Sequence, residues 1–276
     1  MKERVLRIPE NLRILAYGGP GTGKTTFALG LRGLQIEDYD GHAPLLLARL
    51  YRDAKARGDA QEVERLRSTR LVSLPSDVPE EEGFNLACEL HREAVERCRA
   101  GEYSALACDG ATRLTGWAVA KFRKANGHDP EKFEWSQVHS WMQRYVVSLC
   151  NAAPVVVLIC HESLERDQGG NIIGGGPLLA GWESDRFPAL FTEMWRFTAS
   201  TLGKVVQPRL VPTPQSFFNK KGEMLGQFPA RTILGLGTIK DPNFERDVRP
   251  VWEELHALRA EMQEGSEQPE RKEVPQ

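Results

Sequence analysis

The chain has 276 residues, of which 41% are hydrophobic and 27% are charged. These proportions are typical of a globular protein and exclude collagen, an extended coiled coil and wholesale disorder. The 36 basic and 38 acidic residues give a formal charge of −2. The total therefore gives no electrostatic argument for a nucleic acid or an anionic membrane as partner.

Signals for targeting or for a membrane are missing from the sequence. No apolar run reaches the roughly 18 to 20 residues that a membrane-spanning helix needs. The apolar stretch near the start is too short for a signal peptide and runs into a glycine cluster. The five cysteines form no CxxC pair, so we interpret them as reduced core residues. These features predict a cytoplasmic protein without a membrane partner.

The first part of the chain alternates between strand-like and helix-like segments. A strand is expected at residues 13–17, followed by a glycine-rich turn and a short helix. A second strand ends near residues 36–40, and a third covers 70–74. Between them, residues 44–67 have the pattern of a helix or a helix pair broken near Gly58.

The central part continues this alternation with longer elements. An amphipathic helix is expected at residues 84–99, and further helices are expected at 112–127 and about 135–151. A continuous apolar strand ends in Asp109, and another covers residues 155–160. Uninterrupted apolar strands that alternate with helices are typical of a parallel sheet covered on both faces.

Beyond residue 161 the sequence changes character. Residues 161–182 are glycine-rich and polar, which predicts a mobile loop, and short strands near 194–199, 205–211 and 231–236 could extend the sheet at one edge. Residues 261–276 are acidic, with five glutamates against one arginine and one lysine. We expect this tail to be disordered.

The turn after the first strand matches the phosphate-binding pattern GxxxxGK[ST] without a mismatch. Its glycines let backbone N–H groups converge on a phosphate, and the next helix adds its positive N-terminal end. Lys24 is expected to neutralise phosphate oxygens and Thr25 to bind Mg²⁺. ATP with Mg²⁺ is therefore the expected ligand. The residues expected to bind the nucleotide are Gly18, Gly19, Pro20, Gly21, Thr22, Gly23, Lys24, Thr25 and Thr26.

A phosphate-binding loop of this kind needs a second acidic group for the metal, placed at the end of a buried strand. Asp109 follows the apolar segment YSALAC and fits this position. We therefore expect Asp109 and Thr25 to hold the metal together. The alternative is that Asp109 only caps the helix that follows it.

Five segments in order resemble a known family: GGPGTGKTTFALGL, IEDYDG, YSALACDGATRL, VVVLICHES and PLLAGW. They are similar to the RecA-like P-loop ATPases of bacteriophages, which include single-strand annealing recombinases. The likeness covers roughly residues 12–240. It implies an α/β fold with a mostly parallel central sheet, helices on both faces and an antiparallel edge extension. We expect one such ATPase domain over residues 1–260, in the host cytoplasm if a phage encodes it.

The resemblance also implies catalytic roles on the second strand and on the strand at 155–160. Asp40 stands at the position of the base that activates water, with Asp38 as a rival. The family usually has a glutamate there, and with the shorter aspartate we expect slow hydrolysis. His161 stands where the family contacts the γ-phosphate, with Glu162 as a candidate partner. The alternative for His161 is a capping role at the strand end.

Oligomeric members of the family complete each site with a basic residue of a neighbouring subunit, because positive charge stabilises the phosphoryl transition state. Arg231 stands at that position, and Lys220 and Lys221 are alternatives. The resemblance thus implies self-association as a ring or a filament.

Two segments have the composition of a single-stranded DNA contact, which needs basic charge together with aromatic or mobile groups. The first interleaves two phenylalanines with four cations, and the second is the glycine-rich loop. The residues concerned are Lys121, Phe122, Arg123, Lys124, Lys132 and Phe133, and then Arg166 and Asn171. Either segment could instead be a solvated surface.

These features predict a slow, Mg²⁺-dependent ATPase that acts on single-stranded DNA in recombination or annealing. The alternatives are a P-loop motor or loader that remodels another macromolecule and, with less support, a small-molecule kinase. The near-neutral total charge hides a basic segment, residues 194–240, with seven basic residues and one acidic residue. The total charge therefore does not argue against DNA.

Overall fold

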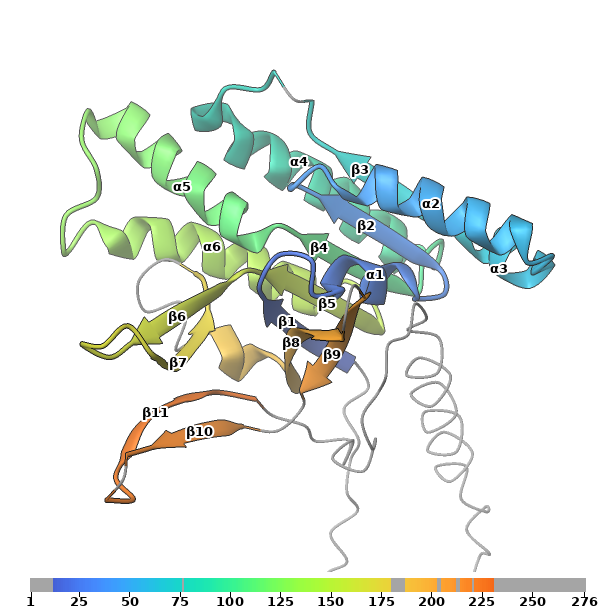
Figure 1. Cartoon of the computed structure of the whole chain (residues 1–276). Helices are drawn as coiled ribbons and strands as arrows, with labels where there is room; N and C mark the ends of the chain where they lie inside the picture. Colours follow the sequence, from blue (N-terminus) through green and yellow to red (C-terminus); the bar gives the residue numbers. More distant parts are fainter. Residues whose placement is uncertain are drawn as a thin grey trace, which may run out of the picture.

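The computed structural model describes residues 12–75, 77–179, 187–202, 205–211, 214–219 and 221–230. Figure 1 shows a central sheet with helices packed against both of its faces. In the described part of the chain, the sheet has seven strands in the order β3-β2-β4-β5-β1-β8-β9. The strands are β1 (Leu12–Gly18), β2 (Leu34–Asp38), β3 (Arg70–Ser73), β4 (Ala105–Asp109), β5 (Val155–Cys160), β8 (Glu193–Leu202) and β9 (Val205–Val211).

All neighbouring strands of this sheet run parallel except β8 and β9, which pair antiparallel at one edge. The central strands are apolar throughout because both of their faces are covered. Leu15 and Leu158 face one core cluster, whereas Ile14 and Val157 face the other. The expected α/β fold, mostly parallel with an antiparallel extension, is confirmed.

Three long helices cover one face of the sheet, and two cover the other. The first group is α4 (Glu80–Arg99), α5 (Ala111–Asn126) and α6 (Trp135–Cys150). On the other face lie α1 (Lys24–Leu29) and α2 (Ala43–Ala56). The chain then turns at Gly58 into α3 (Ala60–Arg67), so the helix pair expected there is present. No helix in the described ranges is long and apolar enough to cross a bilayer.

The prediction of a mobile loop at residues 161–182 was wrong over residues 162–177. Residues 162–177 form an antiparallel hairpin of β6 (Glu162–Arg166) and β7 (Ile172–Pro177). A second hairpin, of β10 (Gln215–Phe218) and β11 (Met224–Phe228), was not expected at all. Both hairpins project from the same side of the sheet (Figure 1).

The two hairpins pack against each other through glycines. A Cβ atom on Gly226 would lie 2.4 Å from the Ile173 carbonyl oxygen, so the backbones of β11 and β7 are in direct contact. A short 3₁₀ helix at Phe187–Leu190 then leads into β8. The strands expected at 194–199 and 205–211 are β8 and β9, whereas 231–236 and the acidic tail lie outside the described residues.

The five cysteines all carry free thiols, four of them buried and Cys88 half-buried. Burial raises the pKa of the Cys98 and Cys150 thiols to about 11. These thiols are therefore protonated and unreactive near neutral pH.

Candidate nucleotide-binding site

The site forms where four parallel strands end at the same edge of the sheet. The register pairs Asp38 with Asp109 across β2 and β4, and Tyr17 with Cys160 across β1 and β5. The residues that directly follow these strands therefore meet at one place. In open α/β sheets this carboxyl edge is where ligands bind.

The glycine-rich turn runs from β1 into α1, as expected. Gly23 caps the helix in a left-handed conformation with φ 93°, which an L side chain would resist. The Lys24 side chain is 7% exposed and folds back over the turn, where Nζ donates to the carbonyl oxygens of Gly18 at 2.8 Å and Gly19 at 2.7 Å. Burial lowers the pKa of Lys24, and Asp109 opposes this shift.

Thr25 and Asp109 meet directly, because the Thr25 hydroxyl donates to Asp109 Oδ2 at 2.6 Å. Asp109 is 3% exposed, and burial raises its pKa to about 7 although the Thr25 bond opposes the shift. A buried carboxylate without a full counter-charge is costly, and a divalent cation would remove that cost. The pair therefore fits Mg²⁺, whose ligands are oxygens.

Asp40 lies beside this pair. A Cβ atom added to Gly110 would meet Asp40 Oδ1 at 2.8 Å, so the Asp40 carboxylate rests on the backbone of the residue that follows Asp109. The negative charge of Asp40 is one cause of the raised Asp109 pKa. The structure thus brings together the expected base and the expected metal ligand.

Asp38 has a different role in the structure. Its two carboxylate oxygens accept hydrogen bonds from the backbone N–H groups of Gly41 at 2.9 Å and Ala43 at 3.0 Å. It is buried, and it closes the turn that starts α2. Asp38 therefore acts as a capping residue, and this leaves Asp40 as the more accessible carboxylate.

His161 faces Asp40, with 3.6 Å between His161 Nε2 and Asp40 Oδ2. Glu162, considered as its partner, instead forms an ion pair with Arg196, with Nε 3.1 Å from Oε2. A Cβ atom on Gly19 would lie 3.2 Å from Glu162 Oε1, so this pair adjoins the phosphate-binding turn. No sequence signal pointed to Arg196, which follows Glu162 by 34 residues.

A buried polar network beneath the site was also missed. Glu37 accepts a hydrogen bond from the Tyr145 hydroxyl at 2.7 Å, and His91 Nδ1 lies 2.9 Å from it. The Tyr39 hydroxyl lies 3.0 Å from that of Tyr145. The network joins β2 to α4 and α6, and its member Tyr39 directly precedes Asp40. The available signal was an acidic residue, Glu37, within a strand predicted to be buried.

The basic segment after Asp109 is not a free cationic surface. Lys121 donates to Asn85 and lies over the Trp141 ring, whereas Lys124 pairs with Glu82 at 3.2 Å. Arg123 pairs with Asp129, with Nη2 2.6 Å from Oδ1.

The aromatic residues of the same segment differ in exposure. Phe122 is buried in the core and cannot stack on a base, so only Phe133, 86% exposed and next to exposed Lys132, has the expected character. In the hairpin, Arg166 donates to the Gly170 carbonyl and Asn171 to Asp167.

The basic residues considered for a neighbouring site are only partly described. Arg231 and Lys220 lie outside the described residues. Lys221 is exposed in the turn between β10 and β11, where its backbone N–H donates to Asn219 Oδ1.

No protein-family model matches the chain, and no curated protein does so. Among solved structures, it is similar to a KaiC-like protein of the hyperthermophilic archaeon Pyrococcus horikoshii OT3, with 15% identity and a TM-score of 0.41 over 72% of this chain and 77% of that one. It is also similar to an ATPase of the type III secretion system of pathogenic bacteria, with 18% identity and a TM-score of 0.44 over 68% of this chain and 51% of that one.

These similarities concern the fold alone, and the chain spans about half the length of the secretion ATPase. The sheet order β3-β2-β4-β5-β1 and the GxxxxGK[ST] turn between β1 and α1 are together typical of a P-loop nucleotide-binding fold.

Proposed function

We propose that the chain binds ATP with Mg²⁺ and hydrolyses it slowly. The observation that carries this proposal is the convergence of Lys24, Thr25, Asp109 and Asp40 at the carboxyl edge of the sheet. A turn that matched the sequence pattern by chance would not have a buried carboxylate on its threonine and a second carboxylate beside it.

Lys24, Thr25 and Asp109 lie together at the phosphate-binding turn. Lys24 Nζ donates to the carbonyl oxygens of Gly18 and Gly19 and, at 3.5 Å, to Thr22 Oγ1. The bond to Thr22 is the longest of the three and is the one that a phosphate oxygen would most readily replace. Thr25 and Asp109 would hold Mg²⁺, which neutralises phosphate charge when bound.

Asp40 is the group that we expect to orient the attacking water. A carboxylate accepts a hydrogen bond from water and can take its proton. His161, whose Nε2 lies 3.6 Å from Asp40 Oδ2, can hold that carboxylate in place or donate to a phosphate oxygen. The Asp40 side chain is one methylene shorter than that of a glutamate at the same position, so we expect slow turnover.

Two substitutions test this proposal by steady-state ATP hydrolysis and by ATP binding in calorimetry. Lys24→Ala should weaken ATP binding by about 10- to 100-fold, because a charge-assisted hydrogen bond is lost. Asp40→Asn should spare binding and slow turnover by about 100-fold. Asp53→Asn, an exposed aspartate on α2, is the matched control. Unchanged ATP affinity in Lys24→Ala would refute the proposal.

We further propose single-stranded DNA as the partner, in recombination or annealing. The feature that supports this partner is the exposed side chain of Phe133 next to the exposed Lys132, in the turn between α5 and α6. An exposed aromatic next to a cation can stack on a base while the cation meets a phosphate. The basic residues within 194–240 add charge.

Fluorescence anisotropy of a labelled oligonucleotide, at low and physiological salt and with and without ATP, tests this partner. Phe133→Ala should weaken binding about 5- to 100-fold, as the loss of one stacking contact predicts. Leu45→Ala, which removes an exposed apolar side chain from α2 outside both basic segments, is the control. If no nucleotide state binds DNA at low salt, a motor or loader for another macromolecule becomes the better proposal, and phosphorylation of a small acceptor would favour a kinase.

We also propose that the chain forms a ring or filament in which Arg231 completes the site of a neighbouring subunit. Mixing Asp40→Asn with Arg231→Ala subunits tests this role directly. If Arg231 acts across an interface, mixed oligomers contain intact sites and regain activity that neither variant has. Recovery of no activity, in oligomers shown by light scattering to be mixed, would place Arg231 outside the neighbouring site.

A further inference from the structure

Thr112 occupies an unusual position at the neck of the β6–β7 hairpin. The last paired residues of the hairpin are Glu162 and Pro177, so the next opposed pair is His161 and Leu178. One bond of that pair is direct, because Leu178 N–H donates to the His161 carbonyl at 2.7 Å. The return bond, from His161 N–H to the Leu178 carbonyl, is replaced by a side chain.

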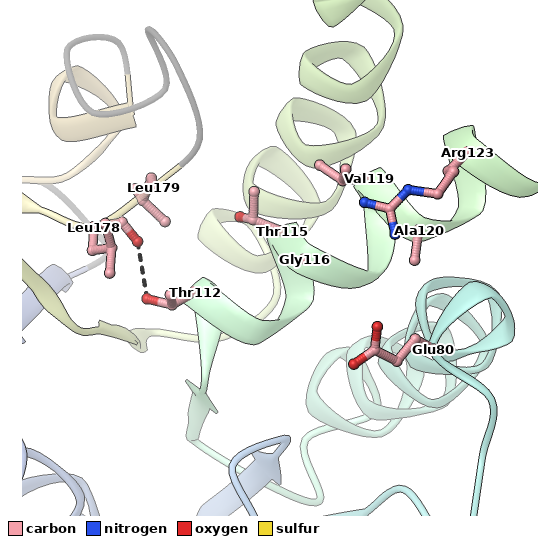
Figure 2. Close-up of a pocket in the computed structure, with 9 residues that line it drawn as sticks. All are labelled: Glu80, Thr112, Thr115, Gly116, Val119, Ala120, Arg123, Leu178 and Leu179. Carbon is pink, nitrogen blue, oxygen red and sulfur yellow. Dashed lines mark hydrogen bonds between the residues drawn. The ribbon is translucent and has the colours of Figure 1, made fainter. Parts of the chain in front are cut away.

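The Thr112 hydroxyl stands in place of the missing bond. It accepts a hydrogen bond from His161 N–H at 3.0 Å and donates to the Leu178 carbonyl at 2.9 Å, as Figure 2 shows for the second contact. Its single proton and an acceptor lone pair are both used. The hydroxyl thus ties the two ends of the hairpin to the first turn of α5.

Thr112 is connected to the nucleotide-binding site in two ways. Along the chain, Thr112 follows Asp109 by three residues, and the intervening Gly110 supports the Asp40 carboxylate. Across the sheet edge, the backbone that Thr112 holds is that of His161, whose ring lies 3.6 Å from Asp40. One hydroxyl therefore fixes the separation between the residue that follows β5 and the helix that follows β4.

We propose that Thr112 is a positioning residue that sets the His161 ring against Asp40. The proposal rests on the ATPase function proposed above and adds to it a residue outside the phosphate-binding turn and the Thr25–Asp109 pair. Without the hydroxyl, His161 N–H and the Leu178 carbonyl lose their shared partner, and the hairpin neck can close on itself and move away from α5. A displacement of about 1 Å at a reacting group can cost on the order of 100-fold in rate.

The test uses Thr112→Val, which keeps the shape of the side chain and removes the hydroxyl, and Thr112→Ser, which keeps the hydroxyl. We expect Thr112→Val to lower kcat about 10-fold with KM and ATP affinity unchanged, and Thr112→Ser to restore most of kcat. Thr115→Val is the matched control. It makes the same change one turn later on α5, where the hydroxyl bonds only to the Ala111 carbonyl.

A second readout does not depend on turnover. The NMR shift of the His161 ring should respond to Asp40→Asn in the otherwise unchanged chain, and this response should shrink at least twofold in the Thr112→Val background. Wild-type kcat together with a full response in Thr112→Val would overturn the proposal. If the unchanged chain hydrolyses no ATP, the proposed function fails, whereas the NMR comparison still decides the role of Thr112.

Discussion

Gly110 determines where the Asp40 carboxylate can lie. Its φ is 105°, and an added Cβ atom would meet Asp40 Oδ1 at 2.8 Å. We predict that Gly110→Ala lowers ATP turnover more than 10-fold, because the carboxylate must move. The variant should also lose about 1 kcal/mol of unfolding free energy through backbone strain.

Gly101→Ala separates these two effects. Gly101 has a similar φ of 81° and nothing within 4 Å of its Cβ position. This variant should lose a similar unfolding free energy in urea titrations and keep its turnover. Equal turnover in the two alanine variants would show that Gly110 matters for backbone conformation only.

The ion pair of Glu162 and Arg196 holds several elements together beside the phosphate-binding turn. Arg196 on β8 also donates to Gln215 of β10 at 2.7 Å and lies over the Phe228 ring of β11. The two side chains of the pair are 13% and 14% exposed, so both charges are largely desolvated. Both hairpins are therefore anchored at the same place on the sheet.

We predict that Arg196→Met lowers the unfolding free energy by about 2 to 4 kcal/mol, because Glu162 is left buried without its partner. Adding Glu162→Gln should recover part of the loss, since the uncompensated charge is then removed. Arg97→Met breaks two exposed pairs, with Glu93 and Glu102, and should cost clearly less than Arg196→Met. Urea unfolding of the three variants measures the differences, and equal costs for Arg196→Met and Arg97→Met would contradict this account.

The contact between the two hairpins depends on close backbone approach. Gly226→Ala should separate β11 from β7, because its Cβ atom would lie 2.4 Å from the Ile173 carbonyl oxygen. Amide exchange in residues 215–228 should then accelerate about 10-fold or more. Gly176→Ala, whose nearest neighbour is Pro229 Cγ at 3.9 Å, should leave exchange unchanged. Similar exchange in the two variants would show that the hairpins do not depend on this contact.

For the whole molecule, the sequence predicted the parallel sheet and much of the candidate site. Long apolar strands separated by amphipathic helices have few alternative folds, and parallel strands bring their carboxyl ends together. Asp109 could therefore be placed at this edge from the apolar strand that it ends, whereas Asp40 and His161 were placed there by the resemblance to a known family.

The β6–β7 hairpin could not be predicted in the same way. Its segment is rich in glycine, and the need for one of these glycines, Gly174, follows from the close approach of Gln227 on β11, a contact distant in the sequence. Arg196 and Thr112 were missed for the same physical reason. Their roles depend on partners 34 and 49 residues away, on other elements of the fold.

The uneven charge of the whole chain gives a last prediction. Residues 261–276 carry five glutamates against two basic residues, and residues 194–240 carry seven basic residues against one acidic residue. If the tail competes with DNA for the basic segment, deleting residues 261–276 should strengthen oligonucleotide binding about 2- to 10-fold at low salt. The gain should fade near physiological salt, where the screening length is about 8 Å.

A variant with the five tail glutamates changed to glutamine keeps the length of the tail and removes its negative charge. It should match the deletion if charge is the cause, because only the electrostatic competition is then lost. Binding measured by anisotropy across a salt series distinguishes the possibilities. A gain in the deletion alone would indicate that the tail obstructs the basic segment by its bulk, and a gain in neither variant would show that the tail does not compete for it.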